Sequence, residues 1–411
     1  MSTKPSAQLI WDHCEELALC SEQTTALTRI FLSREQAAAS QMVLRWMREA
    51  GMQARIDAIG NVVGRYEGDA PGLPCLMLGS HLDTVRDAGK YDGPLGVISA
   101  IECVRVLNAA ARRLPFAIEV VGFSDEEGVR FGATLLGSRA IAGTFDPAAL
   151  ETRDRSGMSM REALDNAGFD ADAIGTAARS SEEILAYAEL HIEQGPVLEA
   201  EGLALGTVTA INGFSRRRFS VKGFAGHAGT VPMRLRQDAL TAAAECVLAV
   251  ERIGRGDPLL VATVGRIEAL PGAINVIPGE ARFTLDVRAP RDALRERAVA
   301  AIAAEVTRLC TARGLGVQME VLQDNPVAAS ASWMMAQMDA AIAAEGLPPY
   351  RLPSGAGHDG MAVAAIAPIV MLFVRCEKGI SHNPAERVTL ADVDVGARVL
   401  LRFIENFKRP A

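Results

Sequence analysis

The segment GSHLDTVRDAGKYDGPLG, residues 79–96, contains side chains that could bind a metal or take part in catalysis, and few large apolar ones. It contains His81, then Asp83 two positions later, and Asp92 further along. A histidine that binds a metal usually donates its second ring N–H to a carboxylate, which fixes the tautomer and the ring orientation. His81 with Asp83 fits this pattern. The glycines around Asp92, such as Gly93 and Gly96, allow the backbone to approach a ligand closely.

Two further histidines and a pair of glutamates occupy comparable places in the sequence. His191 and His382 follow apolar, strand-like runs, as His81 does, and Glu126 and Glu127 in SDEEG follow another. In open α/β sheets the carboxyl ends of the strands converge on one crevice, where ligands bind. Histidines and carboxylates that meet there indicate a metal site.

Each of these residues also has an ordinary structural interpretation. His81 alone would fit a hydrogen-bonded structural histidine, Asp92 a helix cap, and Glu126 and Glu127 a solvated turn. Together they match a site for two metals, which needs about five protein ligands and a carboxylate that bridges ions roughly 3.5–4 Å apart. Three histidines, Asp92 and one glutamate provide five ligands, and the other glutamate remains available to move protons.

The rest of the sequence supplies an α/β framework for these side chains. The spacing predicts helices over 33–51 and 96–113, with Ser33 as N-cap and Gly51 at the C-terminal end of the first. Apolar runs predict strands over 73–79, 116–124, 183–190 and 367–375. Alternation of such runs with amphipathic helices is typical of an α/β domain.

The middle of the chain follows a different order. Residues 213–324 read strand, helix, strand, strand, helix, strand, which is the ferredoxin-like order. The strands are expected at 216–224, 259–270, 279–290 and 316–323, and the helices at 237–253 and 292–314. Because the α/β pattern resumes afterwards, we expect a discontinuous catalytic domain, 1–212 and 325–411, with 213–324 as an inserted domain.

Composition excludes several classes of protein. The chain has 411 residues and a net charge of -8, and its one dense basic cluster is Arg216–Arg218. These features argue against nucleic-acid binding. Seven scattered cysteines without paired spacing fit a reducing compartment. No signal peptide and no apolar run long enough for a bilayer is evident, so we expect a cytoplasmic protein.

Motifs along nearly the whole chain resemble those of a known protein family. They are GSHLDTV with YDGPLG, SDEEG, ELHIEQGP, GHAGTVPM, GAINVIPGEARFTLDVRAP, SGAGHDG and GISHNPAE. In this order they resemble the M20 metal-dependent amidohydrolases, in the branch of allantoate amidohydrolases and N-carbamoyl-L-amino acid hydrolases (carbamoylases and β-ureidopropionases). The histidine at position 191 resembles this branch, since aminopeptidases of the wider family usually have an acidic residue there.

The resemblance implies a fold, a reaction and a set of site residues. The fold is a three-layer α/β/α catalytic domain with a mixed sheet, plus an inserted α+β lid that also forms a homodimer. The reaction is hydrolysis of a ureido C–N bond in a small carboxylate substrate with two divalent ions, zinc or manganese, with cobalt as an alternative. The implied metal ligands are His81, Asp92, Glu127, His191 and His382, with Asp92 bridging.

The resemblance also implies roles around the metals. Glu126 resembles the general base, Asp83 the residue that orients His81, and His227 an oxyanion-stabilising group contributed across the dimer. The implied substrate-binding residues are Gln194, Arg216, His227, Asn275, Arg288, Gly357 and His358. A guanidinium can hold a carboxylate with two parallel hydrogen bonds, which independently favours a carboxylate ligand for Arg288 over a surface ion pair.

Alternatives remain at this point. Phe214 stands where branch members often have glutamine, which puts allantoate in doubt as the substrate. GAGHDG fits a dinucleotide-binding pattern, but LPPYRLPS before it does not read as the buried strand that this motif needs. A metallo-aminopeptidase or dipeptidase on the same scaffold, and a non-catalytic binding protein, are the competing functions.

Overall fold

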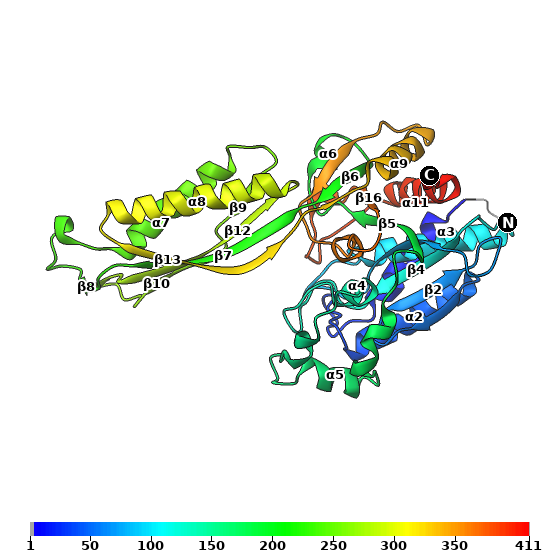
Figure 1. Cartoon of the computed structure of the whole chain (residues 1–411), viewed down its shortest axis with the longest axis horizontal. Helices are drawn as coiled ribbons and strands as arrows, with labels where there is room; N and C mark the ends of the chain where they lie inside the picture. The colour runs from blue at the N-terminus through cyan, green and yellow to red at the C-terminus, as the bar shows by residue number, and fades with distance from the viewer. Residues whose placement is uncertain (1–3, 411) are drawn as a thin grey trace. The chain divides into compact units, whose positions relative to one another are not determined.

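The computed structural model describes residues 4–410, and the chain folds into two compact units (Figure 1). Unit 1 comprises the chain up to Thr209, Ser330–Leu352, and the chain from Ala356 onward; unit 2 comprises Ala210–Ala329 and Pro353–Gly355. Residues 1–3 and 411, which belong to the predicted catalytic segments, lie outside the described residues. Across residues 4–410, no helix combines the length and apolar character needed to span a bilayer.

Unit 1 is built on a mixed sheet of nine strands in the order β1-β2-β4-β3-β5-β16-β6-β14, with β15 beside β6. The bounds are β1 Gln53–Ile56, β2 Val62–Tyr66, β3 Cys75–His81, β4 Ala117–Phe123, β5 Ile184–Ile192, β6 Leu205–Ile211, β14 Ala328–Ala329, β15 Arg351–Ser354 and β16 Ile369–Val374. Strand β14 and the last residues of β6 are part of unit 2. The central strands β4, β3, β5 and β16 are parallel, so their carboxyl ends share one edge, as predicted.

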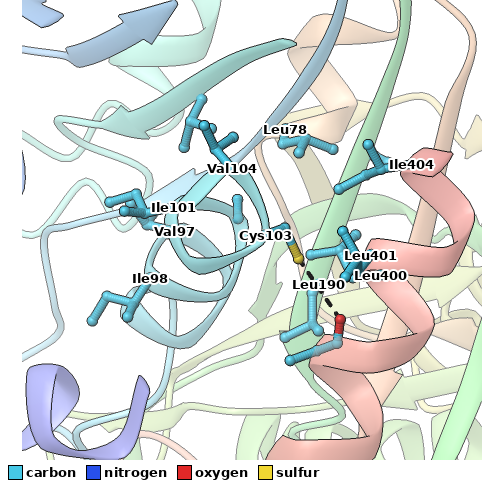
Figure 2. Packing of buried hydrophobic residues seen from close by; sticks show 14 of the residues in the cluster. Leu78, Val97, Ile98, Ile101, Cys103, Val104, Leu190, Leu400, Leu401 and Ile404 are labelled. Atoms are coloured by element: carbon cyan, nitrogen blue, oxygen red, sulfur yellow. Dashed lines mark hydrogen bonds between the residues drawn. The ribbon is translucent and has the colours of Figure 1, made fainter. Parts of the chain in front are cut away.

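One face of this sheet is covered by five helices. They are α1 Ala7–Ala18, α2 Arg34–Glu49, α3 Pro94–Ala109, α9 Ser332–Ala344 and α11 Leu390–Asn406. Alternate strand residues such as Leu78 and Leu190 pack with them in one apolar cluster, and the Cys103 thiol lies 3.7 Å from the Ala397 carbonyl (Figure 2). This cluster is the main core of unit 1.

The opposite face carries the intervening strand residues. Tyr187 and His191 of β5 and Phe373 of β16 lie on it, and the rings of His191 and Phe373 contact that of His358. Here α10, Gly360–Val363, contacts β5, β16 and α4, Leu136–Ile141. Helices on both faces confirm the three-layer α/β/α arrangement. The shorter helices of this unit are η1 Pro147–Glu151, α5 Met160–Asn166, η2 Ala171–Ala177, α6 Val197–Ala200 and η4 Glu377–Gly379.

Local signals in the sequence account for the helix ends near the site. Ser33 caps α2 by accepting a hydrogen bond from the Gln36 amide, as predicted. Helix α3 begins differently, because its N-cap is Gly93 and no side chain caps it. Asp92 is therefore not a helix cap. Gly93 has φ 83°, and a Cβ there would lie 2.6 Å from the His81 ring, so only glycine fits.

Unit 2 has the predicted ferredoxin-like order in an antiparallel sheet, β10-β12-β7-β13 with β9 on β12. Its elements are β7 Gly213–Lys222, β8 Gly226–His227, η3 Met233–Leu235, α7 Ala239–Gly254, β9 Val261–Thr263, β10 Ile267–Leu270, β11 Val276–Ile277, β12 Glu280–Ala289, α8 Asp292–Ala312 and β13 Gly316–Asn325. The α7 and α8 helices pack with the sheet around a separate apolar core.

Two details of unit 2 differ from the prediction. The expected strand 259–270 is split into β9 and β10, because Thr263 pairs with Asp286 and Ile267 with Phe283. Three residues, 264–266, thus lie opposite two, 284–285, so the pairing with β12 is interrupted by one extra residue. The two-residue strands β8 and β11 were not predicted; they pair His227 with Val276.

The segment before GAGHDG also differs. LPPYRLPS contains a strand after all, β15, because four of its residues pair with the edge of the sheet at β6. This strand is partly exposed, and the helix that follows the glycines has only four residues. A dinucleotide site needs a buried strand and a full helix N-terminus, so that alternative gains no support.

Candidate metal centre

The carboxylate of Asp92 lies at the centre of the predicted ligands. His81 is the last residue of β3, and His191 is near the end of the adjacent β5, so both rings meet the loop before α3. The Asp92 Oδ1 atom lies 3.1 Å from His191 Nε2 and 3.6 Å from His81 Nε2. All three side chains are buried.

The second carboxylate oxygen of Asp92 faces a different pair of residues. His382 Nε2 lies 3.2 Å from Asp92 Oδ2 and 3.3 Å from Glu127 Oε1. His382 comes from the loop between η4 and α11, and Glu127 from the loop after β4. Within each group of three residues, one ligand atom from each lies within 4.8 Å of the others. The structure thus brings the five predicted ligands together in two groups that share Asp92.

The contacts within the first group fit a cation better than hydrogen bonds. Ligand atoms around a tetrahedral ion at about 2.0–2.1 Å lie roughly 3.3 Å apart, close to the distances found here. Asp92 Oδ1 and His191 Nε2 are buried and have no hydrogen-bond partner among the described residues. The other ring nitrogen, His191 Nδ1, lies 2.8 Å from the Ile192 carbonyl, which orients Nε2 toward Asp92. Imidazole nitrogens and carboxylate oxygens are suitable donors for zinc, manganese or cobalt.

Electrostatics at this centre also favour bound cations. Burial is the largest influence on the pKa of His81 and His191 and lowers it, but the surrounding carboxylates, with Asp92 foremost, together raise the pKa of both. Contacts with Asp92 and Glu127 raise the pKa of His382 to about 10. In turn, the three histidines hold the pKa of Asp92 well below its usual range despite its burial. The cluster therefore concentrates negative charge on ligand oxygens.

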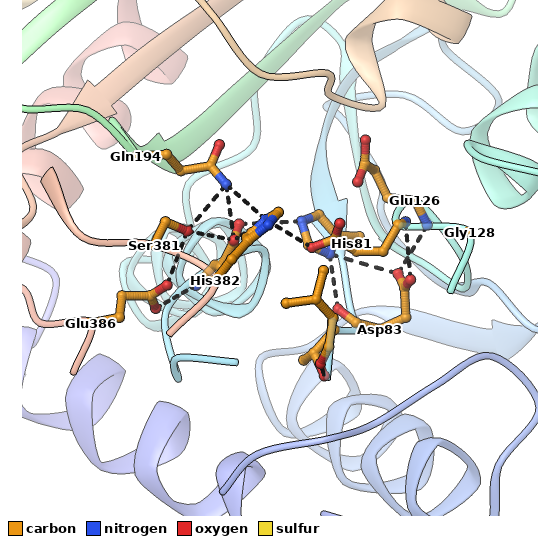
Figure 3. A network of polar contacts seen from close by, with 12 residues as sticks. His81, Asp83, Glu126, Gly128, Gln194, Ser381, His382 and Glu386 are labelled. Carbon is orange, nitrogen blue, oxygen red and sulfur yellow. Dashed lines mark hydrogen bonds and ion pairs between the residues drawn. The ribbon is translucent and has the colours of Figure 1, made fainter. Parts of the chain in front are cut away.

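Asp83 and Glu126 lie beside the ligands (Figure 3). The Asp83 carboxylate accepts hydrogen bonds from the backbone amides of Glu126, at 2.9 Å, and Glu127, at 3.1 Å. His81 Nδ1 lies 3.0 Å from the Asp83 backbone carbonyl and 3.6 Å from its carboxylate. The main-chain carbonyl of Asp83 thus contacts Nδ1 of His81, the ring nitrogen that does not face Asp92. The Asp83 side chain fixes the loop that carries both glutamates.

Glu126 lies within reach of His81 and Glu127. One carboxylate oxygen of Glu126, one of Glu127 and a ring nitrogen of His81 lie within 4.8 Å of one another. Burial and then the Glu127 charge raise the pKa of Glu126 well above its usual value. A carboxylate with a raised pKa can accept a proton and return it near neutral pH.

Three more predicted residues of unit 1 lie around this centre. Gln194 donates its amide to Asp92 Oδ2 over 2.9 Å. A Cβ built on Gly357 would lie 3.6 Å from Glu126 Oε1, so its backbone borders the proposed base. The His358 ring packs edge-on against that of His191, with centroids 4.5 Å apart, and burial followed by His191 holds its pKa well below the usual value. A neutral His358 therefore adds no charge to the centre.

The remaining predicted residues belong to unit 2. His227 and Asn275 are exposed at the small two-stranded β8–β11 sheet, where the Ala228 amide donates to the Asn275 carbonyl over 3.0 Å. Arg216 and Arg288 share the Asp286 carboxylate, each with a nitrogen 3.1 Å from Oδ2. A second nitrogen of Arg288 donates to Asp286 Oδ1 over 2.9 Å, so its bidentate face is already occupied.

Phe214 lies against the same pair of arginines. The guanidinium carbons of Arg216 and Arg288 are 4.7 and 5.7 Å from its ring centroid. Phe214 faces Arg288 across β7 and β12, and it offers them only an aromatic ring. Cations are attracted to such a ring at this distance.

Sequence reasoning missed several polar residues that support the ligands. Glu189 lies two residues before His191 on the same face of β5 and accepts hydrogen bonds from Ser80 and Tyr187. Strand alternation within ELHIEQ could have identified it. Ser381 and Glu386, which flank His382 in GISHNPAE, contact the Asp92 segment. Only proximity in sequence to His382 pointed to them.

Comparison with known proteins agrees with this geometry. The sequence model of Peptidase family M20/M25/M40 matches residues 77–406. The chain is 42% identical over 392 residues to the N-carbamoyl-L-amino acid amidohydrolase of Geobacillus stearothermophilus, covering 95% of this chain and 96% of that one. It is 40% identical over 422 residues to an allantoate deiminase of Arabidopsis thaliana, covering 95% of this chain and 80% of that one.

A solved structure extends the likeness to the whole fold. The crystal structure of a hydantoinase/carbamoylase family amidase from Burkholderia multivorans superposes with a TM-score of 0.91 at 34% identity and covers 98% of each chain. Relatives this similar over nearly their full length confirm the resemblance drawn from the motifs. The chain belongs to the M20 family, in its branch of N-carbamoyl-L-amino acid and allantoate amidohydrolases.

Proposed function

We propose that the protein is a two-metal hydrolase that cleaves the ureido C–N bond of a small carboxylate, such as an N-carbamoyl-L-amino acid or allantoate. The observation that carries this proposal is the division of Asp92 between two ligand groups, with His81 and His191 on one oxygen and His382 and Glu127 on the other. A carboxylate placed in this way suits a pair of ions. Relatives with these activities support the choice of reaction.

His81, Asp92, Glu127, His191 and His382 would hold two divalent ions, zinc or manganese, with cobalt as an alternative. When bound, such ions lower the pKa of water and polarise a carbonyl group. Asp83 would keep His81 and the glutamate loop in place through the contacts described above. Gln194, Gly357 and His358 would border the substrate.

Glu126 would serve as general base and then as general acid. It takes a proton from the attacking water, whose oxygen adds to the ureido carbonyl carbon. The C–N bond to the leaving nitrogen then breaks, and Glu126 delivers the proton to that nitrogen. The products are an amine or ammonia together with a carbamate, which breaks down to carbon dioxide. The raised pKa of Glu126 suits both directions of transfer.

Residues 213–324 would act as a lid and dimerisation domain. His227 would stabilise the developing oxyanion across a homodimer, and Asn275, Arg216 and Arg288 would bind the substrate. Large apolar side chains are exposed near His227 and Asn275 in sequence, with Phe224 at 72% and Met233 at 77% on either side of His227, and Ile274 at 103% directly before Asn275. Exposed large apolar side chains are frequent at interaction surfaces, which supports the proposed homodimer.

The expected location is the cytoplasm. All seven cysteines are free and six are buried, which suits a reducing compartment.

A substrate screen tests the proposed reaction. Purified protein, with zinc, manganese or cobalt restored, would be assayed with allantoate, an N-carbamoyl-α-amino acid, a β-ureido acid and ureidoglycolate, and with a panel of dipeptides. We expect turnover of at least one ureido substrate and none of the peptides. Cleavage of peptides alone would favour the aminopeptidase alternative, and turnover of nothing would favour a binding protein.

A further inference from the structure

Glu386 links two loops that are nearly 300 residues apart in the sequence. Its carboxylate is buried, and Oε1 accepts hydrogen bonds from the backbone amides of Tyr91, at 2.9 Å, and Asp92, at 3.2 Å. One oxygen therefore fixes the main chain that carries the shared Asp92 carboxylate. Glu386 itself follows His382 by four residues, so the contact ties the two loops together.

The other oxygen of Glu386 reaches the same carboxylate through a serine. Ser381 Oγ lies 3.2 Å from Glu386 Oε2 and 2.8 Å from Asp92 Oδ2 (Figure 3). The shorter distance assigns the hydroxyl proton to Asp92. Gln194 Nε2 donates to the same Oδ2 over 2.9 Å. Two neutral donors thus hold the oxygen that faces His382 and Glu127.

The two oxygens of Asp92 are consequently in different environments. Oδ1 faces His81 and His191 and has no hydrogen-bond donor among the described residues, whereas Oδ2 has two. The histidines that face the two oxygens also differ in exposure. The His191 side chain, which faces Oδ1, is 0% exposed, and that of His382, which faces Oδ2, is 48% exposed. The position of Oδ2 depends on its hydrogen-bonded neighbours far more than that of Oδ1.

Packing leaves Glu386 no freedom to move away. A Cβ built on Gly89 would lie 2.2 Å from Glu386 Cδ and 2.3 Å from its Cβ, so the side chain lies directly on the glycine backbone. A side chain held by packing and by two backbone amides adopts one position, and its neighbours adopt theirs accordingly.

We propose that Glu386, with Ser381, is a positioning residue that sets the affinity of the Asp92–Glu127–His382 group for its ion. This inference rests on the proposed two-metal function. Partners that orient metal ligands commonly change metal affinity by about 10- to 100-fold when they are removed. The effect is expected at this group and not at the His81–Asp92–His191 group.

Zinc titrations of the metal-free protein against a chelator of known affinity test the proposal without substrate. We assign the more weakly bound ion to the Asp92–Glu127–His382 group, because His382 is half exposed. We expect Glu386→Ala to raise the Kd of this ion about 10- to 100-fold and Ser381→Ala about tenfold. Glu386→Gln, which keeps an oxygen for the two amides, should stay within about threefold. The Kd of the tighter ion should change less than about threefold in all three variants.

Asp57→Asn provides a matched control, because the Asp57 carboxylate also accepts two backbone amides, those of Ile59 and Asn61. It should leave both zinc affinities unchanged. An unchanged second Kd in Ser381→Ala overturns the proposal even if Glu386→Ala does not fold, and so does an equal loss of both ions. A parent protein that binds a single ion would instead contradict the two-metal function itself.

Discussion

The candidate metal centre and the predicted substrate residues of unit 2 differ in how completely the chain itself fixes them. The His81 and Asp92 side chains are 3% and 5% exposed and are held by close contacts within unit 1. In unit 2, His227 and Asn275 are exposed, the Arg216 side chain is 42% exposed, and Arg288 binds Asp286 in place of a ligand. The candidate metal ligands already lie together, whereas the unit 2 residues are exposed or paired with another side chain of the protein. We infer that changes in unit 1 affect metal and chemistry, and changes in unit 2 affect substrate.

The largest effect is expected at Glu126. Glu126→Gln keeps the size of the side chain but removes its capacity to accept a proton, so kcat should fall by about 10³-fold or more. Metal content, measured by elemental analysis, should be unchanged because Glu126 is not among the proposed ligands. Glu182→Gln, at an exposed position, is the control. Normal turnover in Glu126→Gln would contradict the role of Glu126 as base.

His227 tests the other region. If it stabilises the oxyanion across a dimer, His227→Ala should lower kcat by about 10²- to 10³-fold with normal metal content. Mixing this variant with Glu126→Gln should restore part of the activity. A mixed dimer has one active site in which both Glu126 of one subunit and His227 of the other are intact. His13→Ala, which removes a histidine of α1 that stacks on Trp46, is the control. A fully active monomer would exclude this role.

Arg288 should affect substrate binding more than chemistry. Arg288→Ala removes a bidentate donor, and a charged hydrogen-bonded contact is worth about 1.5–3 kcal/mol, so KM for carboxylate substrates should rise about 10- to 100-fold. Arg282→Ala is the matched control, since Arg282 is also on β12 and also pairs with a carboxylate, that of Glu280. Equal KM values in the two variants would show that Arg288 serves only its contact with Asp286.

The smallest effect is expected at Phe214. Phe214→Gln restores an amide near Arg216 and Arg288 and should shift the ratio of kcat/KM toward allantoate by a few-fold, about 1 kcal/mol or less. Phe219→Leu, in the apolar core of unit 2, would report general effects of altered packing. No change in the substrate ratio would remove Phe214 from the specificity determinants.

The sequence predicted the fold, and the candidate ligands that the structure brings together, because the signals of both are local. Apolar runs that end in His81 and His191 became parallel neighbours β3 and β5, and the order of elements in 213–324 was confirmed. The break between β9 and β10, the two-stranded β8–β11 sheet and strand β15 depend on pairing with distant segments, so local patterns did not reveal them. Glu386 escaped notice for the same reason, since its partners at Tyr91 and Asp92 are about 295 positions away.

Anomalous diffraction from crystals grown with zinc or manganese tests the two-metal centre most directly. We expect two peaks about 3.5–4 Å apart, one on each side of the Asp92 carboxylate, the first bound by His81 and His191 and the second by Glu127 and His382. A single peak, or peaks that do not contact Asp92, would contradict this arrangement.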